Sequence, residues 1–274
     1  MALLPSPEEI ETALKTGERV AALWKRISDY FRRKRTYALF SGMEGVGKTV
    51  LLDYLTGRAY ERGYEPPDTS KRAERGTTTS AKWPVGLVVV PGQFSRPRME
   101  AVEGTLLGKR PPVGVVHVVA NGFASVRGHE ASDTIAKTAK LKTVAEWQKS
   151  QRKREIEELE QVCGWIRQAH RNRRQPAWLI LTVTKYDLFP DATADLHDDY
   201  FPGGRGEVVK LLDELTRRVG SDNFRWQATT ACGFLSDQLV AKAEVKSRLS
   251  PQQRDVLVEE LGKLIGGFCY DERE

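Results

Sequence analysis

Residues 42–49 read G-M-E-G-V-G-K-T, and this octapeptide constrains the fold more than any other part of the chain. A short apolar run at residues 37–40 precedes it, and apolar residues recur at helical spacing over residues 50–55 behind it. Gly42 and Gly47 allow main-chain amides to turn inward around a phosphate, while the start of the following helix adds its positive dipole end. The order strand, glycine-rich loop and helix therefore predicts a phosphate-binding loop at the carboxyl end of a strand.

The side chains at the end of this octapeptide suit a nucleotide phosphate. Lys48 is expected to neutralise the β- and γ-phosphates, and Thr49 to offer its hydroxyl to Mg2+, a cation that prefers oxygen ligands. The alternative is a glycine-rich turn that joins a strand to a helix and binds nothing. The residues predicted to contact the phosphates are Gly42, Gly45, Val46, Gly47, Lys48, Thr49 and Val50.

Apolar runs of strand length alternate with helical patterns along the rest of the chain. Each run is rich in Val, Ile or aromatic residues, the usual composition of a buried strand. The runs lie at residues 36–40, 85–90, 113–120, 178–184 and 224–229. This alternation predicts an α/β fold with a mainly parallel sheet of five or six strands and helices on both faces. A last helix is expected behind Ser250, where Gln253 completes a capping box.

Two further helical segments extend this fold. Residues 7–33 have an amphipathic pattern, so residues 1–35 are expected to be a helical N-terminal extension and residues 36–274 the α/β domain. The interval from about 131 to 174 is long, and its centre, residues 148–160, is almost wholly charged or polar. We interpret this interval as an extended helical elaboration whose middle projects into water.

The composition excludes several classes of protein. With 274 residues, 40% of them hydrophobic, 23 Gly and 13 Pro, the chain is an ordinary globular sequence. Its apolar runs are far shorter than the roughly 20 residues that span a bilayer, and its start lacks the pattern of a secretory signal. A cytoplasmic location is therefore expected. The three cysteines match neither a disulfide framework nor a zinc motif, and the four histidines are expected to be structural or solvent-facing.

The net charge of +6 favours acidic partners without identifying them. Basic clusters at residues 25–35 and 167–174 could face nucleic acid or an anionic membrane surface. A solvated face is the commoner explanation of such runs, and no RNA-binding motif accompanies them.

A second motif follows the predicted strand 178–184, where the chain reads Thr184-Lys185-Tyr186-Asp187. It is similar to the base-specificity motif N-K-x-D of the P-loop GTPases of the Ras-like and Era-like (TRAFAC) class, with Thr in place of Asn. The resemblance implies that Asp187 accepts two hydrogen bonds from guanine, because adenine has no such pair of donors on that edge. It also implies that the stem of Lys185 lies along the base, and that Thr184 stands where the family's Asn ties this loop to the phosphate loop. The alternative is a simple polar strand exit.

Thr230-Ala231-Cys232 follow the predicted strand 224–229 and are similar to the S-A-K turn of the same family. In the family the alanine amide contacts the guanine carbonyl, so the resemblance assigns Thr230 and Ala231 to the base site. The tripeptide alone is a weak signal. Its place, one helix-strand unit after Asp187, supports the assignment because ligands in such folds lie at the carboxyl ends of the strands.

Arg75-Gly76-Thr77-Thr78-Thr79 resembles the first switch of this family, whose threonine reaches Mg2+ and the γ-phosphate. We assign that role to Thr78, with either neighbouring threonine as an alternative. Arg75 then stands three residues earlier, as the internal arginine of heterotrimeric G-protein α subunits does. Such an arginine stabilises the charge that develops during phosphoryl transfer. A turn of threonines beside a solvent-exposed arginine is the alternative interpretation.

Residues 88–93 read V-V-V-P-G-Q and resemble the family's second switch, D-x-x-G followed by Gln. The resemblance implies that Gly92 contacts the γ-phosphate through its amide and that Gln93 orients the attacking water. Val89, however, occupies the position of the Asp that holds a water on Mg2+, and valine cannot do this. GTP hydrolysis is therefore expected to be slow, to need a partner, or to be absent.

Together the motifs predict a guanine-nucleotide-binding molecular switch that binds GTP or GDP with Mg2+, hydrolyses GTP slowly or with assistance, and acts through a protein effector or regulator. One alternative is a pseudo-GTPase, a scaffold that binds nucleotide without cleaving it. Another is a P-loop ATPase or kinase, which would need its own metal-binding carboxylate at a strand end and would leave the motif ending in Asp187 unexplained.

Overall fold

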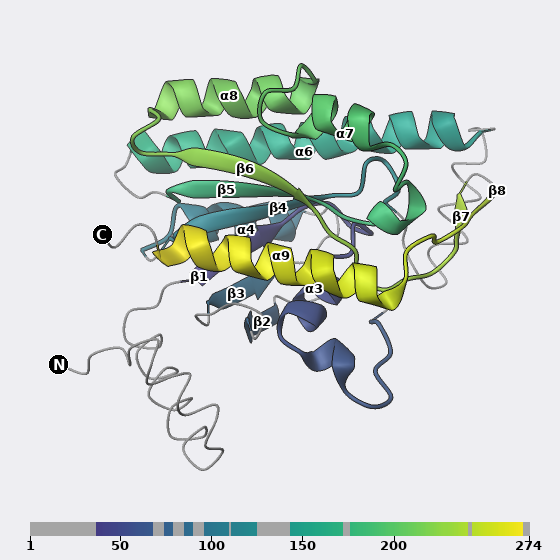
Figure 1. The fold of residues 1–274 in the computed structure, drawn as a ribbon. Helices are drawn as coiled ribbons and strands as arrows, with labels where there is room; N and C mark the ends of the chain where they lie inside the picture. The colour runs from purple at the N-terminus through teal and green to yellow at the C-terminus, as the bar shows by residue number, and fades with distance from the viewer. Residues whose placement is uncertain are drawn as a thin grey trace, which may run out of the picture.

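The central feature of the structure is a six-stranded sheet with the strand order β2-β3-β1-β4-β5-β6 (Figure 1). The computed structural model describes residues 37–67, 74–78, 85–89, 96–109, 111–124, 143–171, 176–240 and 243–270. The predicted N-terminal helix at residues 7–33 lies outside the described residues.

The strands and helices have the following bounds. The strands are β1 (Tyr37–Ser41), β2 (Glu74–Thr77), β3 (Gly86–Val89), β4 (Gly114–Val119), β5 (Trp178–Val183), β6 (Arg225–Thr230), β7 (Gln238–Val240) and β8 (Ala243–Val245). The helices are α3 (Lys48–Leu55), α4 (Arg96–Leu106), α6 (Val144–Arg171), α7 (Thr193–Tyr200), α8 (Glu207–Val219) and α9 (Pro251–Tyr270), with single 3-10 turns at η1 (Arg58–Tyr60) and η2 (Tyr186–Leu188). The five predicted strands are present. The sequence did not predict β2, or β7 and β8, which pair with each other in a separate hairpin.

Every strand pair of the large sheet is parallel except β2 with β3, which is antiparallel. The parallel strands therefore end at one edge of the sheet, which we call the carboxyl edge, and begin at the opposite amino edge. All residues of β4 and β5 are buried, as expected for strands covered on both faces. The predicted α/β fold with a mainly parallel sheet is confirmed.

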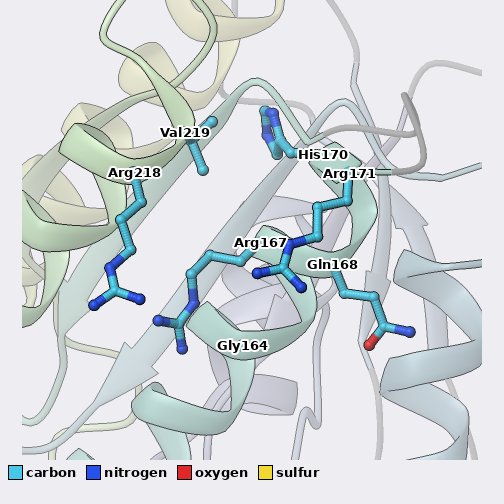
Figure 2. A pocket seen from close by; sticks show the side chains of 7 residues that line it. All are labelled: Gly164, Arg167, Gln168, His170, Arg171, Arg218 and Val219. Carbon is cyan, nitrogen blue, oxygen red and sulfur yellow. The ribbon is translucent and has the colours of Figure 1, made fainter.

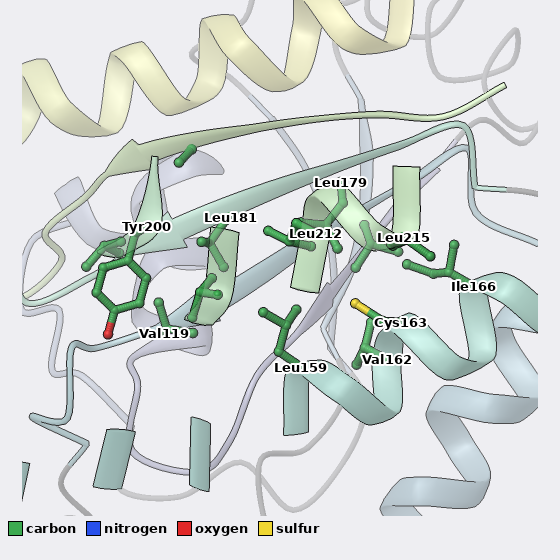
Figure 3. Close-up of a cluster of buried hydrophobic side chains, with 14 of the residues drawn as sticks. Val119, Leu159, Val162, Cys163, Ile166, Leu179, Leu181, Tyr200, Leu212 and Leu215 are labelled. Carbon is green, nitrogen blue, oxygen red and sulfur yellow. The ribbon is translucent and has the colours of Figure 1, made fainter. Parts of the chain in front are cut away.

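Side chains that alternate along the strands feed two hydrophobic cores, one on each face of the sheet. Leu39 and Leu179 point into the core covered by α4, α6, α7 and α8, part of which Figure 3 shows. Phe40 and Ile180 point into the core covered by α3 and α9. Figure 1 shows α6 and α8 on one side of the sheet and α9 on the other. No helix among the described residues combines the length and apolar composition needed to cross a bilayer.

The last helix, α9, begins at the predicted capping box. The Gln253 amide donates to Ser250 Oγ at 3.2 Å, and the Ser250 amide donates to Gln253 Oε1 at 2.9 Å. Further along the helix, Phe268 meets the Trp178 ring edge-on, with ring centroids 5.5 Å apart. This contact anchors the end of α9 beneath the start of β5.

The expected helix between β4 and β5 is present as α6, but the prediction that its middle projects into water is wrong. Gln151, Glu155 and Glu158 are buried against the rest of the domain, and Leu159 and Ile166 continue the same face into the core. The spacing of these residues is helical, so α6 has one buried face along its whole length. The charge of the segment concealed this face because three of its members are polar.

Glu155 explains how a carboxylate is accommodated on the buried face of α6. Its two carboxylate oxygens accept hydrogen bonds from the amides of Ala120, at 2.9 Å, and Gly122, at 3.2 Å, in the loop that follows β4. One helical turn away, Arg152 pairs with Asp199 at 2.8 Å. Buried polar groups are tolerated when they are hydrogen-bonded in this way. The helix therefore supports the carboxyl edge of the sheet through a polar contact.

We predict that the stability of the protein falls between about pH 4.5 and pH 7 because of Glu155. Burial raises the pKa of Glu155 from 4.5 to about 7. In this interval the folded state binds a proton that the unfolded chain has lost, so the free energy of unfolding decreases as the pH rises, by on the order of 3 kcal/mol, and levels off above pH 7.

The measurement is the free energy of unfolding of wild type minus that of Glu155→Gln, followed from pH 4.5 to 8. Glu157→Gln is the matched control, because Glu157 lies on the exposed side of the same helix and pairs with Lys153. The free energy of unfolding of wild type minus that of the variant should decline as the pH rises for Glu155→Gln, and should stay constant for Glu157→Gln. A difference that is constant with pH would contradict a raised pKa.

Candidate functional site

The glycine-rich octapeptide lies at the carboxyl end of β1 and leads into α3. Gly42, Gly45 and Gly47 have φ values of 132°, 79° and 88°, which residues with a Cβ rarely adopt. A Cβ on Gly42 would also lie 2.2 Å from the carbonyl oxygen of Val118 in β4. Both the backbone conformation and the close approach of β4 therefore require glycine at the start of this loop.

Lys48, the first residue of α3, turns back over the loop. Its ammonium group donates to the carbonyl oxygens of Gly42, at 2.7 Å, and Met43, at 2.9 Å, and the residue is buried. The positive charge is thus held at the loop whose glycines expose main-chain amides. Thr49 and Val50 follow in the first turn of the helix. This arrangement fits a phosphate group, which needs donors and positive charge together.

A buried hydrogen bond supports the base of this loop. Ser41 Oγ, in the last residue of β1, lies 2.9 Å from His117 Nδ1 of β4, and these two residues are register partners in the sheet. His117 therefore has a structural role, as expected of the histidines from the sequence.

Thr184 joins the phosphate loop to the end of β5. Its hydroxyl oxygen lies 2.6 Å from the carbonyl oxygen of Val46 in the loop and 2.9 Å from that of Val119 at the end of β4. The next residue, Lys185, has a φ of 56°, so the chain turns sharply into η2. A single hydroxyl proton, shared between two carbonyls, thus connects three segments at the carboxyl edge.

Asp187 lies in η2 beside the turn that follows β6. Cys232 Sγ donates to Asp187 Oδ1 at 3.0 Å, and the Arg248 amide donates to the Asp187 carbonyl at 2.9 Å. Burial, followed by the charge of Asp187, raises the pKa of the Cys232 thiol, so the thiol keeps its proton and remains a donor. The amide of Tyr186 also reaches the carbonyl of Ala231 at 3.4 Å. The structure therefore brings together Thr230-Ala231-Cys232 and the motif that ends in Asp187.

Lys185 connects two more segments to this site. Its ammonium group donates to the carbonyl of Phe123, in the loop after β4, at 2.8 Å, and to Gln238 Oε1 of β7 at 3.2 Å. Gln238 could not be predicted from the sequence, because a strand of three residues has no detectable pattern. The contact of Cys232 with Asp187 could not be predicted either, because the two residues are 45 positions apart and no local pattern joins them.

The structure does not bring Thr78 to the phosphate loop. Because β2 is antiparallel to β3, its first residue, Glu74, lies at the carboxyl edge and its last, Thr77, at the amino edge. Thr78 follows Thr77 and is 1% exposed; it bonds Val85 through its amide (3.0 Å) and its hydroxyl (3.1 Å). The assignment of Thr78 as a switch and metal-binding residue therefore does not fit. The alternative Thr77 lies within β2, and the other, Thr79, is outside the described residues.

The role of Arg75 in phosphoryl transfer depends on Thr78 being the switch threonine three residues later. Because Thr78 does not lie at the phosphate loop, that role has no support from the spacing. It lies exposed in the edge strand β2, opposite Val88, and its charge opposes the burial that raises the pKa of Tyr37 at the start of β1. The chain enters β2 from the carboxyl edge.

Val89 ends β3 opposite Phe40, next to the phosphate loop, and is buried in the core beneath α3 and α9. The position of the second-switch aspartate is therefore apolar and packed. Gly92 and Gln93 lie outside the described residues. In the part of the chain that is described, no cluster of His, Cys, Asp and Glu side chains could hold a metal ion. A Mg2+ ion at this site would depend on the Thr49 hydroxyl and on oxygens of the nucleotide and water.

No family model matches the chain, and no curated protein matches it in sequence. Solved structures do show a similar course of the chain. Toc33 from Arabidopsis thaliana in complex with Mg2+ and GMPPNP has 15% identity and a TM-score of 0.43, over 93% of this chain and 95% of that one. The SRb-GTP/SRX complex of the signal recognition particle receptor from Chaetomium thermophilum has 12% identity and a TM-score of 0.42, over 75% and 96%. These low values add nothing to the assignment of the site, which follows from its geometry.

The strand order, the antiparallel edge strand and the phosphate loop after β1 decide the fold class. It is an α/β fold with a glycine-rich loop after the first strand of a mainly parallel sheet. In this fold the motifs 42–49, 184–187 and 230–232 share the carboxyl edge, where ligands of such sheets bind.

We predict that Thr184→Val lowers the free energy of unfolding by about 1–3 kcal/mol, because the buried carbonyl of Val46 loses its hydroxyl donor, while the Val119 carbonyl keeps the Thr184 amide at 2.7 Å. Amide hydrogen exchange in residues 42–47 should also become faster. Thr182→Val is the matched control. Thr182 is buried two residues earlier in β5, and its hydroxyl has no hydrogen-bond partner among the described residues. Equal losses in the two variants would show that Thr184 does not hold the loop.

Proposed function

We propose that this protein is a guanine-nucleotide-binding switch that binds GTP or GDP together with Mg2+. The observation that carries the proposal is the bond between Thr184 and Val46, at 2.6 Å, which holds the phosphate loop beside the loop of Asp187. One ligand can then place its phosphates over Gly42–Lys48 and its base at Asp187. Neither half of the site alone would identify a nucleotide.

Recognition of the base is assigned to the Asp187 carboxylate. It can accept hydrogen bonds from the ring N–H and the exocyclic amine of guanine, whereas adenine has no such pair of donors on that edge. The thiol of Cys232 occupies one lone pair of Oδ1 and fixes the orientation of the carboxylate. Three further acceptor positions remain on the group. The resemblance assigns the Ala231 amide to the guanine carbonyl, but in the structure this amide donates to the Val183 carbonyl at 2.8 Å.

Binding of the phosphates is assigned to the main-chain amides of the loop and to Lys48. The ammonium group of Lys48 exchanges carbonyl partners for phosphate oxygens, and the first turn of α3 adds its dipole. Thr49 supplies the hydroxyl for Mg2+, which the nucleotide brings with it.

Hydrolysis of GTP is the less supported half of the proposal. Gln93 is the candidate for orienting the attacking water, and an effector or regulatory protein would read the state of the bound nucleotide. The packed apolar position of Val89 favours a second candidate, a pseudo-GTPase that holds nucleotide for structure. An ATPase or kinase has less support, since it leaves Asp187 without a role.

We predict that Asp187→Asn weakens GDP binding by about tenfold to a hundredfold, because two hydrogen bonds to a charged acceptor are lost. Affinity for xanthosine diphosphate should rise, since the new amide can donate to the xanthine carbonyl. Titrations with GDP, ADP and xanthosine diphosphate measure this. Asp191→Asn, an exposed change of the same charge four residues away, should leave all three affinities unchanged. Equal wild-type affinities for GDP and ADP would refute the guanine assignment.

We predict that single-turnover release of phosphate from bound GTP is slow in wild type and slower by about a hundredfold in Gln93→Ala, the range typical of a positioned catalytic group. GDP affinity should not change in this variant. Release that is absent in wild type, alone and with proteins that copurify, would leave the pseudo-GTPase as the function.

A further inference from the structure

A cavity with a volume of about 760 Å3 lies between α6 and α8, remote from the nucleotide site (Figure 2). The end of α6 leads to the first residue of β5, and the end of α8 leads to the first residue of β6. The cavity therefore lies at the amino edge of the sheet, whereas the phosphate loop lies at the carboxyl edge. It is a separate site.

Three arginines from the two helices surround this cavity. Arg167 and Arg171 are four residues apart on one face of α6, and Arg218 faces them from the last turn of α8. Figure 2 shows the three guanidinium groups gathered around the same space. This arrangement concentrates positive charge in a concave surface, where a small anion can meet all three groups.

The charge of this group is not balanced within the described residues. Arg217 and Arg218 share a single carboxylate, that of Glu214. Arg167 and Arg171 form no ion pair with any other described residue. The negative ends of the helix dipoles favour basic residues in the last turns of α6 and α8, but Arg167 lies a full turn before the end of α6. A bound anion would offset the repulsion among these groups.

The other residues that line the cavity leave it open and add no charge. Gly164 lies one turn before Arg167, and a Cβ added there would meet only the Arg167 guanidinium, at 3.9 Å. Glycine inside a helix is less stable than alanine, and local packing does not require it here. His170 forms another wall and donates from Nε2 to the Pro176 carbonyl at 3.0 Å. Burial lowers the pKa of His170, so it adds no charge near neutral pH.

We propose that this cavity binds a small ligand that carries two or more neighbouring phosphate groups, either free in solution or as the headgroup of a lipid. Guanidinium groups bind phosphate oxygens in pairs, and three of them match more negative charge than one carboxylate or one phosphate carries. The volume is within the range of about 300–1,000 Å3 that small-molecule sites have.

The test measures binding of inorganic triphosphate by calorimetry at constant ionic strength, in a Lys48→Ala background so that the phosphate loop does not contribute. The variant Arg167→Gln/Arg171→Gln/Arg218→Gln should lose about tenfold or more in affinity. The matched control, Lys149→Gln/Lys153→Gln/Arg154→Gln, removes the same charge from an earlier part of α6 and should lose less than about threefold. Equal losses would show diffuse attraction and overturn the proposal, as would no binding before the arginines are changed.

A second variant tests the cavity without changing any charge. Gly164→Met fills the open wall and should weaken triphosphate binding as strongly as the arginine changes, while its unfolding transition remains cooperative. Unchanged affinity in this variant would place the ligand outside the cavity and overturn the proposal.

Two further arms distinguish the source of the phosphates. Vesicles of phosphatidylcholine with phosphatidylinositol 4,5-bisphosphate identify a lipid headgroup if they bind the protein and triphosphate displaces them. Triphosphate binding without vesicle binding identifies a free ligand. Oligouridine whose affinity rises with length above that of triphosphate would instead indicate a nucleic-acid surface and overturn the proposal.

Discussion

The arrangement of the proposed nucleotide site depends on one buried hydroxyl. Thr184 lies within hydrogen-bonding distance of carbonyl oxygens in the phosphate loop and at the end of β4, so it connects two loops and a strand end that are distant in sequence. The buried carbonyl of Val46 would be costly to leave without this donor, and this cost keeps the phosphate loop against the end of β5. A site for an extended ligand needs its two ends held at a fixed separation, and this bond supplies that constraint.

Other side chains extend the same principle along the carboxyl edge. Glu155 of α6 accepts the amides of the loop after β4, and Lys185 donates to the Phe123 carbonyl in that loop. Cys232 donates to Asp187 across the two loops of the base site. Each loop is thus held by a side chain from a neighbouring element, so the site is organised by the fold before a ligand arrives. The helix α6 takes part in this support despite its high charge.

Much of the fold and the phosphate loop could be predicted, because their signals are local. Apolar runs identified β1, β3, β4, β5 and β6, since buried parallel strands are apolar on both faces. The assignment of Thr78 to the first switch failed for the opposite reason. Thr78 and Arg75 were placed by motif order alone, whereas β2 runs antiparallel and carries Thr78 to the far edge. The buried face of α6 was also missed, because Gln151, Glu155 and Glu158 are polar and their partners are distant loops.

The sequence by itself determined the α/β class, the glycine loop with its lysine, and the residue types of the base motif, since these follow from periodicity and conformational preference within a few residues. Only the tertiary structure decided which motifs meet, that the Thr184 hydroxyl bonds the Val46 carbonyl, and that arginines of α6 and α8 converge on a cavity. The physical reason is that contacts between segments far apart in sequence depend on strand order and direction, and on hydrogen bonds that no local pattern encodes.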